Sequence, residues 1–403
     1  MGKAYLTTYS YDCELAFNAS DGTSTTILPQ TIKYIMVEHD YKKRVMPVIY
    51  MKVNLTASIY NKMIIQQGTA KMYLKLYRTR KTGSTSSAPK KVIYDEFDYY
   101  MPDDPNANKK LDKVNESSDT SYKTCFIGLI KTSLQDLNKK TYEGIYKNTT
   151  LMSLVQSATS NMKMVIQPFT NNVSISSFMC PSVSSTGQFI AYLNSKYNFY
   201  NGTYIYYMDF DKTYLISNDG SYIDAKDGDK KYIALDIRDL TSSQALTTGM
   251  IEDEDQDAYI IYVNGADATI TVDRVTSALT GEVSSINSGE GKVIDTAVID
   301  TSKVTSIGTS GGITIVSSTD PNNALSIKTK ITENTNTLTF TKLDMDSKIF
   351  TPNKQYLLSN YEDNPKYCGV YYLVSKKEIY LRTGDQLTCQ MTIVLKKCAD
   401  YIK

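Results

Sequence analysis

Residues 70–80 read AKMYLKLYRTR, and apolar and polar side chains alternate along most of this stretch. Successive side chains of a strand point to opposite faces of a sheet, so a period of two gives a strand with one buried face. The inward set is Met72, Leu74 and Leu76, and the outward set is Tyr73, Lys75 and Tyr77. Similar runs lie at residues 33–37, 48–55 and 92–100. These strands predict that a β-barrel or β-sandwich opens the protein.

Two polar segments interrupt this pattern. Residues 81–89 are rich in Ser, Thr and Gly, and they predict a long hairpin loop between two strands. Residues 102–119 are polar, charged and almost free of bulky apolar side chains. They predict an exposed loop that separates two structural units.

The composition is that of a packed globular protein. Of 403 residues, 41% are hydrophobic and 22% are charged, which excludes wholesale disorder and a coiled coil. The 44 Lys and Arg balance the 43 Asp and Glu, and the formal charge of +1 provides no overall field for nucleic acid or an anionic membrane. The length predicts two to four domains of roughly 100 to 200 residues each.

The chain carries no sign of a membrane or secreted protein. No stretch reaches the ~20 apolar residues that cross a bilayer, and the N-terminus lacks the apolar centre of a signal peptide. We therefore predict no membrane segment and a protein made in the cytoplasm. The six cysteines include no CxxC pair, which predicts reduced, mostly buried thiols.

The aromatic composition is unusual, with 33 Tyr, no Trp and a single His. Tyrosine combines a large rigid contact area with a polar end, which suits sheet surfaces and protein interfaces. An AT-rich genome would also enrich Tyr, Lys, Asn and Ile. Both causes are consistent with the sequence.

Two amphipathic helices are predicted in the middle of the chain. The first has Thr149 or Thr150 as its N-cap, and its apolar stripe is Leu151, Leu154, Val155, Ala158 and Met162. The second is capped near Ser185 or Thr186, and its apolar face is Phe189, Ile190, Leu193 and Tyr197. A strand is predicted between them at residues 164–166.

Strands resume after the second helix. Residues 199–214 read FYNGTYIYYMDFDKTY, in which Asn201-Gly202 is predicted to form the turn of a hairpin. Residues 217–231 predict a loop and residues 232–237 a strand. Short β-branched runs between residues 247 and 336, such as 268–272 and 313–316, predict a β-meander with long loops. Final strands are predicted at 337–341, 367–374 and 387–395, the last with an inward set of Leu387, Cys389, Met391, Ile393 and Leu395.

The sequence supplies none of the side-chain sets that catalysis commonly uses. A single His excludes a site with several His ligands, and the Cys and Gly spacings form neither a zinc ribbon nor a phosphate-binding loop. We interpret His39 as a solvated or capping residue. The acidic clusters at 252–255 and at Asp224, Asp227 and Asp229 lack the ligand order of an EF-hand loop. We therefore predict no enzymatic activity, no cofactor and no metal site.

Two segments of the chain resemble the baseplate hub proteins of tailed phages. Residues 149–220 contain the helix LMSLVQSATSNM, then SSFMCPSVSSTGQFIAYLNSKYNFY, and then NGTYIYYMDFDKTYLISNDG. Phe350 to Cys389 read FTPNKQYLLSNYEDNPKYCGVYYLVSKKEIYLRTGDQLTC, in which an aromatic strand precedes the last strand of the chain. With the opening strands, these segments cover about half of the chain. Residues 247–330 show no such likeness.

This resemblance implies a mainly β fold with a few helices (α+β). It consists of two tube-like β-barrel domains plus inserted smaller α/β and β-rich domains. The implied units are a first β-barrel at 1–120, a helix-containing inserted domain at 121–200, strands that return to the first barrel at 201–245, a β-rich inserted domain at 246–335, and strands of the second β-barrel at 336–403.

The resemblance also implies a structural role. Hub proteins of this family form a threefold ring whose three chains present six similar barrels, which matches a trimeric central spike to a sixfold tail tube. The implied partners are two further copies in a homotrimer, the tail spike protein, the tail tube or tube-initiator protein and other baseplate proteins, without nucleic-acid specificity. The implied location is the baseplate of the virion, after assembly in the host cytoplasm.

Seven aromatic residues are candidates for contacts between subunits. They are Tyr197, Tyr200, Tyr204 and Tyr206 near the middle hairpin, and Phe350, Tyr367 and Tyr371 near the end of the chain. An equally simple interpretation places each of them in a barrel core or a cross-strand pair.

Two other functions fit the same sequence. A distal-tail or receptor-binding protein would bind carbohydrate through its loops. A tail-associated hydrolase of the cell wall would be a monomer that clears peptidoglycan.

Overall fold

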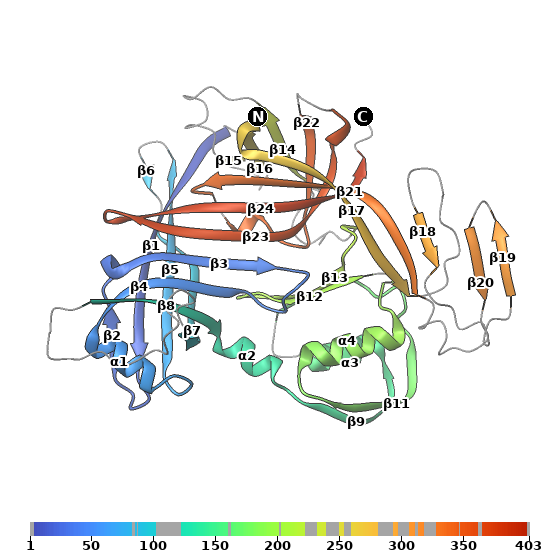
Figure 1. Cartoon of the computed structure of the whole chain (residues 1–403), viewed down its shortest axis with the longest axis horizontal. Coiled ribbons are helices and arrows are strands. Elements are labelled where there is room, and N and C mark those ends of the chain that lie inside the picture. Colours follow the sequence, from blue (N-terminus) through green and yellow to red (C-terminus); the bar gives the residue numbers. More distant parts are fainter. Residues whose placement is uncertain are drawn as a thin grey trace.

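A computed structural model describes residues 4–82, 85–86, 88–101, 122–159, 163–200, 203–221, 232–238, 250–253, 259–280, 293–296, 306–310, 313–317, 328–345, 347–361 and 365–400. Strands dominate these residues, and four α-helices occur among them (Figure 1). The mainly β, α+β class that the sequence predicts is confirmed.

Eight strands form a closed antiparallel sheet, which we call the first barrel. Their order is β1 (Ala4–Asn18), β5 (Lys71–Thr82), β7 (Lys90–Tyr100), β8 (Tyr122–Lys131), β4 (Val48–Thr56), β3 (Ile32–Asp40), β23 (Gly369–Thr383) and β24 (Gln386–Asp400). Tyr11 of β1 pairs with Leu387 of β24, which closes the circuit. The strands predicted near residues 33–37, 48–55, 70–80 and 92–100 are therefore confirmed.

Alternation along these strands produces the barrel core. The inward sets predicted for β5 and β24 are both buried, and each has its intervening residues at or near the surface. Short elements complete this part of the chain. Strand β2 (Ser24–Ile27) pairs with β1, β6 (Thr85–Ser86) pairs with β5, and helix α1 (Ala57–Ile65) follows β4. Helix α1 begins where the Thr56 hydroxyl accepts a hydrogen bond from the Ile59 backbone N–H, as N-caps do.

A second circuit of strands shares β23 and β24 with the first barrel. It continues from β23 through β22 (Gln355–Tyr361), β14 (Tyr232–Arg238) and β16 (Tyr259–Asn264), and β16 runs on through a short 3-10 turn into β17 (Ala268–Thr280). β17 pairs with β21 (Lys328–Leu343), and β21 pairs with β24, which returns the circuit to its start. Figure 1 shows this second group of strands beside the first barrel.

The strand β23 serves both circuits because it changes neighbours along its length. Residues 369–372 pair with β22, and residues 375–381 pair with β3. The register against β24 shifts between Val370 and Tyr371 and again between Leu373 and Ser375. Bulges of this kind bend a strand, so one strand can follow two differently oriented sheets.

A helix-containing unit joins β8 to the second circuit. Its elements are α2 (Thr132–Asn138), β9 (Tyr142–Thr150), α3 (Leu151–Ala158), β10 (Met164–Ile166), β11 (Ser174–Val183), α4 (Thr186–Tyr197), β12 (Tyr204–Met208) and β13 (Thr213–Ser217). Strands β9 and β11 form one small sheet, and β10, β13 and β12 form another. Apolar side chains of α2, α3, α4 and β11 share a core with Tyr206, Met208 and Leu215. Other side chains of the second small sheet belong instead to the core of the first barrel, namely Val165, Ile205, Tyr207, Tyr214 and Ile216. Both predicted helices are confirmed, with Thr150 and Ser185 as N-caps; predicted stripe residue Met162 lies outside the described residues.

The structure contains a hairpin after the predicted turn at Asn201-Gly202. The hairpin is formed by β12 and β13, and its turn lies at Asp209–Lys212. There the Asp209 N–H donates to the Lys212 carbonyl at 2.8 Å, and the Asp209 carboxylate accepts from the Phe210 N–H at 2.8 Å. An aspartate that binds a nearby backbone amide favours a turn. Asn201 and Gly202 themselves lie outside the described residues.

The remaining strands are short. They are β15 (Met250–Asp253), β18 (Val293–Thr296), β19 (Ser306–Ser310) and β20 (Ile313–Ser317). The strands predicted at residues 232–237, 268–272, 313–316 and 337–341 are confirmed within β14, β17, β20 and β21. The division of the chain into domains at residues 120, 200, 245 and 335 stays a prediction.

Gly220, which follows β13, provides a first test of the packing beside the second circuit. Its φ is +75°, and a Cβ at this position would lie 2.6 Å from the Tyr372 ring. We expect Gly220→Ala to lower the free energy of unfolding by about 2–4 kcal/mol in urea, because backbone strain and overlap add. The matched control is Gly22→Ala, where φ is +85° and nothing lies within 4 Å of the added Cβ. It should cost only about 1 kcal/mol, and equal effects of the two changes would contradict the packing described here.

Candidate functional site

The turn of the β12–β13 hairpin is bound to the first barrel. The Met208 N–H donates to the carbonyl of Val45 at 2.7 Å, just beyond β3. The Lys131 ammonium, at the end of β8, donates to the carbonyl of Phe210 at 2.6 Å. These two bonds connect the helix-containing unit to the barrel.

Aromatic side chains fill the space beneath this turn. The Phe210 ring lies edge-on to Phe97 of the barrel core, with ring centres 6.3 Å apart, and edge-on to His39 at 5.9 Å. Tyr207 of the hairpin lies edge-on to Tyr41 at 4.5 Å. The hairpin therefore packs against the barrel through rings as well as backbone bonds.

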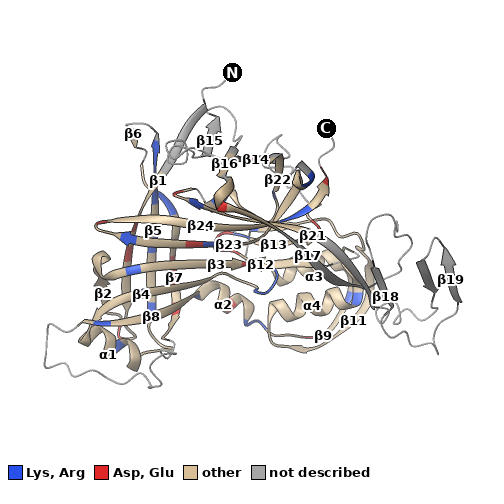
Figure 2. Cartoon of the chain, turned by 45° about the horizontal axis from the view of Figure 1, so that its top comes forward, with Lys and Arg blue, Asp and Glu red and all other residues tan. Residues whose placement is uncertain are grey.

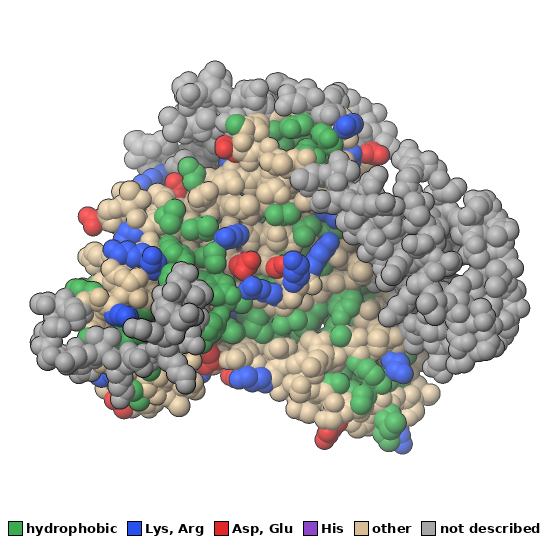
Figure 3. All heavy atoms as spheres, in the orientation of Figure 1, with side chains coloured by type: hydrophobic (Ala, Val, Ile, Leu, Met, Phe, Trp, Pro, Cys, Tyr) green, Lys and Arg blue, Asp and Glu red, His purple; other side chains and the backbone are tan. Residues whose placement is uncertain are grey.

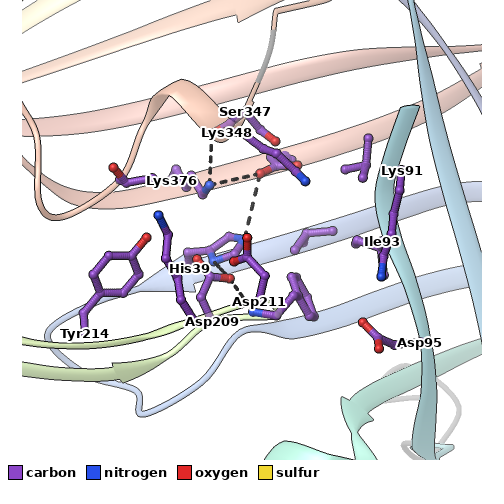
Figure 4. Close-up of a pocket in the computed structure, with 16 residues that line it drawn as sticks. His39, Lys91, Ile93, Asp95, Asp209, Asp211, Tyr214, Ser347, Lys348 and Lys376 are labelled. Carbon is purple, nitrogen blue, oxygen red and sulfur yellow. Dashed lines mark hydrogen bonds and ion pairs between the residues drawn. The ribbon is translucent and has the colours of Figure 1, made fainter. Parts of the chain in front are cut away.

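Four ionisable side chains are buried at this junction. His39 and Glu378 are 2% and 3% exposed, and Lys376 and Asp209 are also buried. The His39 Nδ1 lies 3.1 Å from the Tyr207 hydroxyl and 3.7 Å from the Asp209 carboxylate, and Nε2 lies 3.8 Å from Glu378. Figure 4 shows His39, Asp209 and Lys376 around one hollow, carried by the barrel and by the hairpin.

Glu378 and Lys376 form the barrel side of this cluster. The Lys376 ammonium lies 3.7 Å from the Glu378 carboxylate and donates to the Ser347 carbonyl at 3.1 Å. The Tyr380 hydroxyl donates to the same carboxylate. Buried charges are tolerated when they are paired and hydrogen-bonded in this way, and removal of one partner is then costly.

The interpretation of His39 as a solvated or capping residue was wrong. His39 follows Ile35 and Val37 at a spacing of two on β3, so it points inward with them, and all three are buried. The pKa of His39 is lowered from 6.5 to about 3, mainly by burial and also by the charge of Lys376, while the charge of Glu378 opposes both. The alternation of buried and exposed residues along β3 is the sequence signal that would have predicted a buried His39.

This chemistry favours a structural role for the cluster. An imidazole whose pKa lies near 3 is a poor general base at neutral pH, because efficient proton transfer needs a pKa close to the working pH. Within the described ranges, no group of three or more His, Cys, Asp or Glu side chains is arranged to hold a metal ion. The acidic residues at 224–229 and at 254–255 lie outside those ranges. The cysteines in the structure are free thiols, and four of them are buried.

The predicted contact residues occupy different environments. Phe350, Tyr371, Tyr200 and Tyr206 are buried within the chain, whereas Tyr197, Tyr204 and Tyr367 are partly exposed. The Tyr200 hydroxyl, for example, lies within hydrogen-bond distance of two carbonyl oxygens, 3.0 Å from that of Gln167 and 2.9 Å from that of Leu215. The part that any of these residues takes in a subunit interface stays a prediction.

Because of His39, we expect the free energy of unfolding to decrease as the pH falls below 6.5. The unfolded chain binds a proton at its single His near pH 6.5, whereas the folded chain binds it only near pH 3, so between these values the unfolded state holds more protons. We expect about 1.4 kcal/mol lost per pH unit below 6.5 from this residue. His39→Gln, which cannot protonate there, should have a correspondingly shallower slope of unfolding free energy between pH 6.5 and 5.

The same residue gives a direct spectroscopic check. Because the chain contains one His, its imidazole proton resonance needs no assignment. The resonance should not titrate between pH 5 and 8. A midpoint near 6.5 would contradict the buried, neutral imidazole.

Comparison with known proteins places the chain in a phage family. A family model described as the Bacteriophage PBS1 gene 109 protein matches residues 1–398. The chain belongs to this family. The resemblance to proteins of tailed phages is thereby confirmed. No curated protein matches the chain.

Solved structures show looser likenesses. A tail protein from Neisseria meningitidis MC58 is 10% identical over 97% of both chains, with a TM-score of 0.47. The 43 kDa tail protein of prophage MuSo2 from Shewanella oneidensis is 10% identical over 97% of this chain and 100% of that chain, with a TM-score of 0.40. The E. coli c3393 protein is described as a type VI secretion component similar to T4 tail proteins gp27 and gp5. It is 7% identical over 92% of this chain and 74% of that chain, with a TM-score of 0.39. Likenesses at this level do not assign a role.

Two further features are the distribution of basic residues and the character of the helices. Figure 2 shows Lys and Arg spread along several of the described strands. Among the described residues, no helix combines the length and the apolar character that a membrane crossing requires.

Proposed function

We propose that this phage protein is a structural hub of the tail baseplate. In this proposal three copies form a threefold ring that joins the tail tube to the central spike. The supporting observation is that a single chain contains two strand circuits that share β23 and β24. Three copies would present six such circuits, a number that suits a sixfold tube on one side and a trimeric spike on the other.

Other features support a non-enzymatic role. The one buried cluster of ionisable side chains described above holds the hairpin to the barrel, and its His39 is neutral at physiological pH. A formal charge of +1 allows copies to stack closely without strong repulsion. The proposed partners are further copies of the chain, the spike, the tube or tube-initiator protein and other baseplate proteins. The proposed location is the tail of the virion, after assembly in the host cytoplasm.

The mass of the purified chain in solution tests this proposal. Light scattering after size exclusion, at several concentrations and with the candidate spike, should give a species of three 45.2 kDa chains, about 136 kDa, alone or within the complex. A chain that stays at 45.2 kDa under every condition would refute the ring.

A further inference from the structure

The turn of the β12–β13 hairpin lines two neighbouring hollows. Lysines line both of them. One, of about 200 Å³, is lined in part by Lys91, Lys212, Lys348 and Lys376. The other, of about 470 Å³, is lined in part by Lys131, Lys140 and Lys163. Phe210 and Asp211 line both hollows, so the two are neighbours. We call these seven lysines and the surfaces between them the lysine site; Figure 3 shows basic and acidic side chains gathered in the middle of this face.

The lysine site carries an excess of positive charge. Its carboxylates are Asp95, Asp136, Asp209, Asp211 and Glu378, which is two fewer than its lysines. Lys131 lies 3.1 Å from Asp95, and Lys376 lies 3.7 Å from Glu378. This excess is concentrated in one region of a chain whose total charge is only +1.

Two further observations in the 200 Å³ hollow point to an anionic ligand. Thr351 lines it, and the buried hydroxyl of this residue has no hydrogen-bond partner among the described residues. Burial lowers the pKa of Lys348, Asp211 opposes this, and the positive charges of Arg78, Lys91 and Lys376 lower it further. A bound carboxylate would accept from the hydroxyl and offset the mutual repulsion of these cations.

The chain itself contains a complementary segment. Residues 252–257 read EDEDQD, with five carboxylates in six residues. Glu252 and Asp253 end strand β15, whose backbone pairs with β1 and β16 and with no strand or turn that lines the lysine site. The backbone pairing of β15 therefore gives no contact between this strand and the lysine site of the same chain.

We infer that the lysine site binds the acidic run, residues 252–257, of a second copy of this chain. The inference rests on the proposed self-assembly and adds the charges that drive it. The contact joins two different surfaces, so it is heterologous, and heterologous contacts close into rings when the rotation between copies permits. Opposite charges on the two surfaces would fix the register and speed the encounter.

A peptide experiment tests the contact independently of the ring. A fluorescent peptide of residues 250–259, MIEDEDQDAY, should bind the full chain in anisotropy titrations, and rising salt should weaken the binding. The control peptide has every Glu changed to Gln and every Asp to Asn. Equal binding of the two peptides, or no binding of the acidic one at low salt, would overturn the inference.

Variants of the full chain locate the binding surface. The combination Lys140→Gln, Lys163→Gln and Lys348→Gln should reduce peptide affinity at least tenfold. A matched combination of three lysines outside both hollows, Lys62→Gln, Lys147→Gln and Lys196→Gln, should leave it unchanged. Both variants should keep the unfolding midpoint of the parent chain. Asp211→Asn should raise the affinity, because it removes a negative charge from the wall that both hollows share. If only the matched combination loses affinity for the peptide, the peptide binds at another surface and the lysine site is not its binding site.

Assembly measurements separate this inference from the proposed ring. Neutralising the acidic run by Glu252→Gln, Asp253→Asn, Glu254→Gln, Asp255→Asn and Asp257→Asn should leave a monomer where the parent chain forms the trimer. A neutralised chain that still trimerises would overturn the inference and leave the ring intact. A parent chain that is monomeric in all conditions counts against the ring, and the peptide titration then decides on the lysine site alone.

Discussion

Glu378→Leu is expected to lower the free energy of unfolding by about 3–5 kcal/mol, because it leaves the buried Lys376 ammonium without its carboxylate. The change also removes the acceptor of the Tyr380 hydroxyl. Urea unfolding followed by circular dichroism measures the loss. The size of this effect reflects the burial of both charges at the junction of barrel and hairpin.

A paired variant is the control for this prediction. Lys376→Met combined with Glu378→Leu removes both charges, and apolar replacement of a buried ion pair is often nearly neutral. The double variant should therefore recover most of the stability that Glu378→Leu loses. If the double variant were no more stable than the single one, the unpaired charge would not be the cause.

Leu373→Ala is expected to cost about 2–5 kcal/mol, because Leu373 is fully buried where β23 passes from one strand circuit to the other. Its partner across the sheet is Leu395, which is also fully buried. Leu381→Ala on the same strand is the matched control, since Leu381 is 40% exposed. It should cost less than about 1 kcal/mol.

The shape of the unfolding curve carries additional information. Because β23 and β24 belong to both circuits, the Leu373→Ala chain should lose both in one transition. Two well-separated transitions, or equal effects of the two leucine changes, would show that the circuits do not depend on this strand.

Local sequence patterns predicted most individual elements. Alternation alone identified the inward faces of β5 and β24, and the caps Thr150 and Ser185 set the starts of α3 and α4. These signals act over a few residues, where strand and helix periodicity is decided. They could not show which strands become neighbours.

The sharing of β23 between two circuits was beyond such patterns. It depends on residues 375–381 pairing with residues 34–40, near the other end of the chain. The candidate site was missed for a related reason. His39 was judged from its charged neighbours in sequence, whereas its environment is set by its phase on β3 and by Tyr207 of a distant hairpin.

A map of the intact tail by electron cryomicroscopy tests the proposed position and copy number of this chain. We expect three copies of the chain around the tail axis, with their six strand circuits in one layer between tube and spike. A map with this chain at another position, or with a different number of copies in the ring, would contradict the proposal.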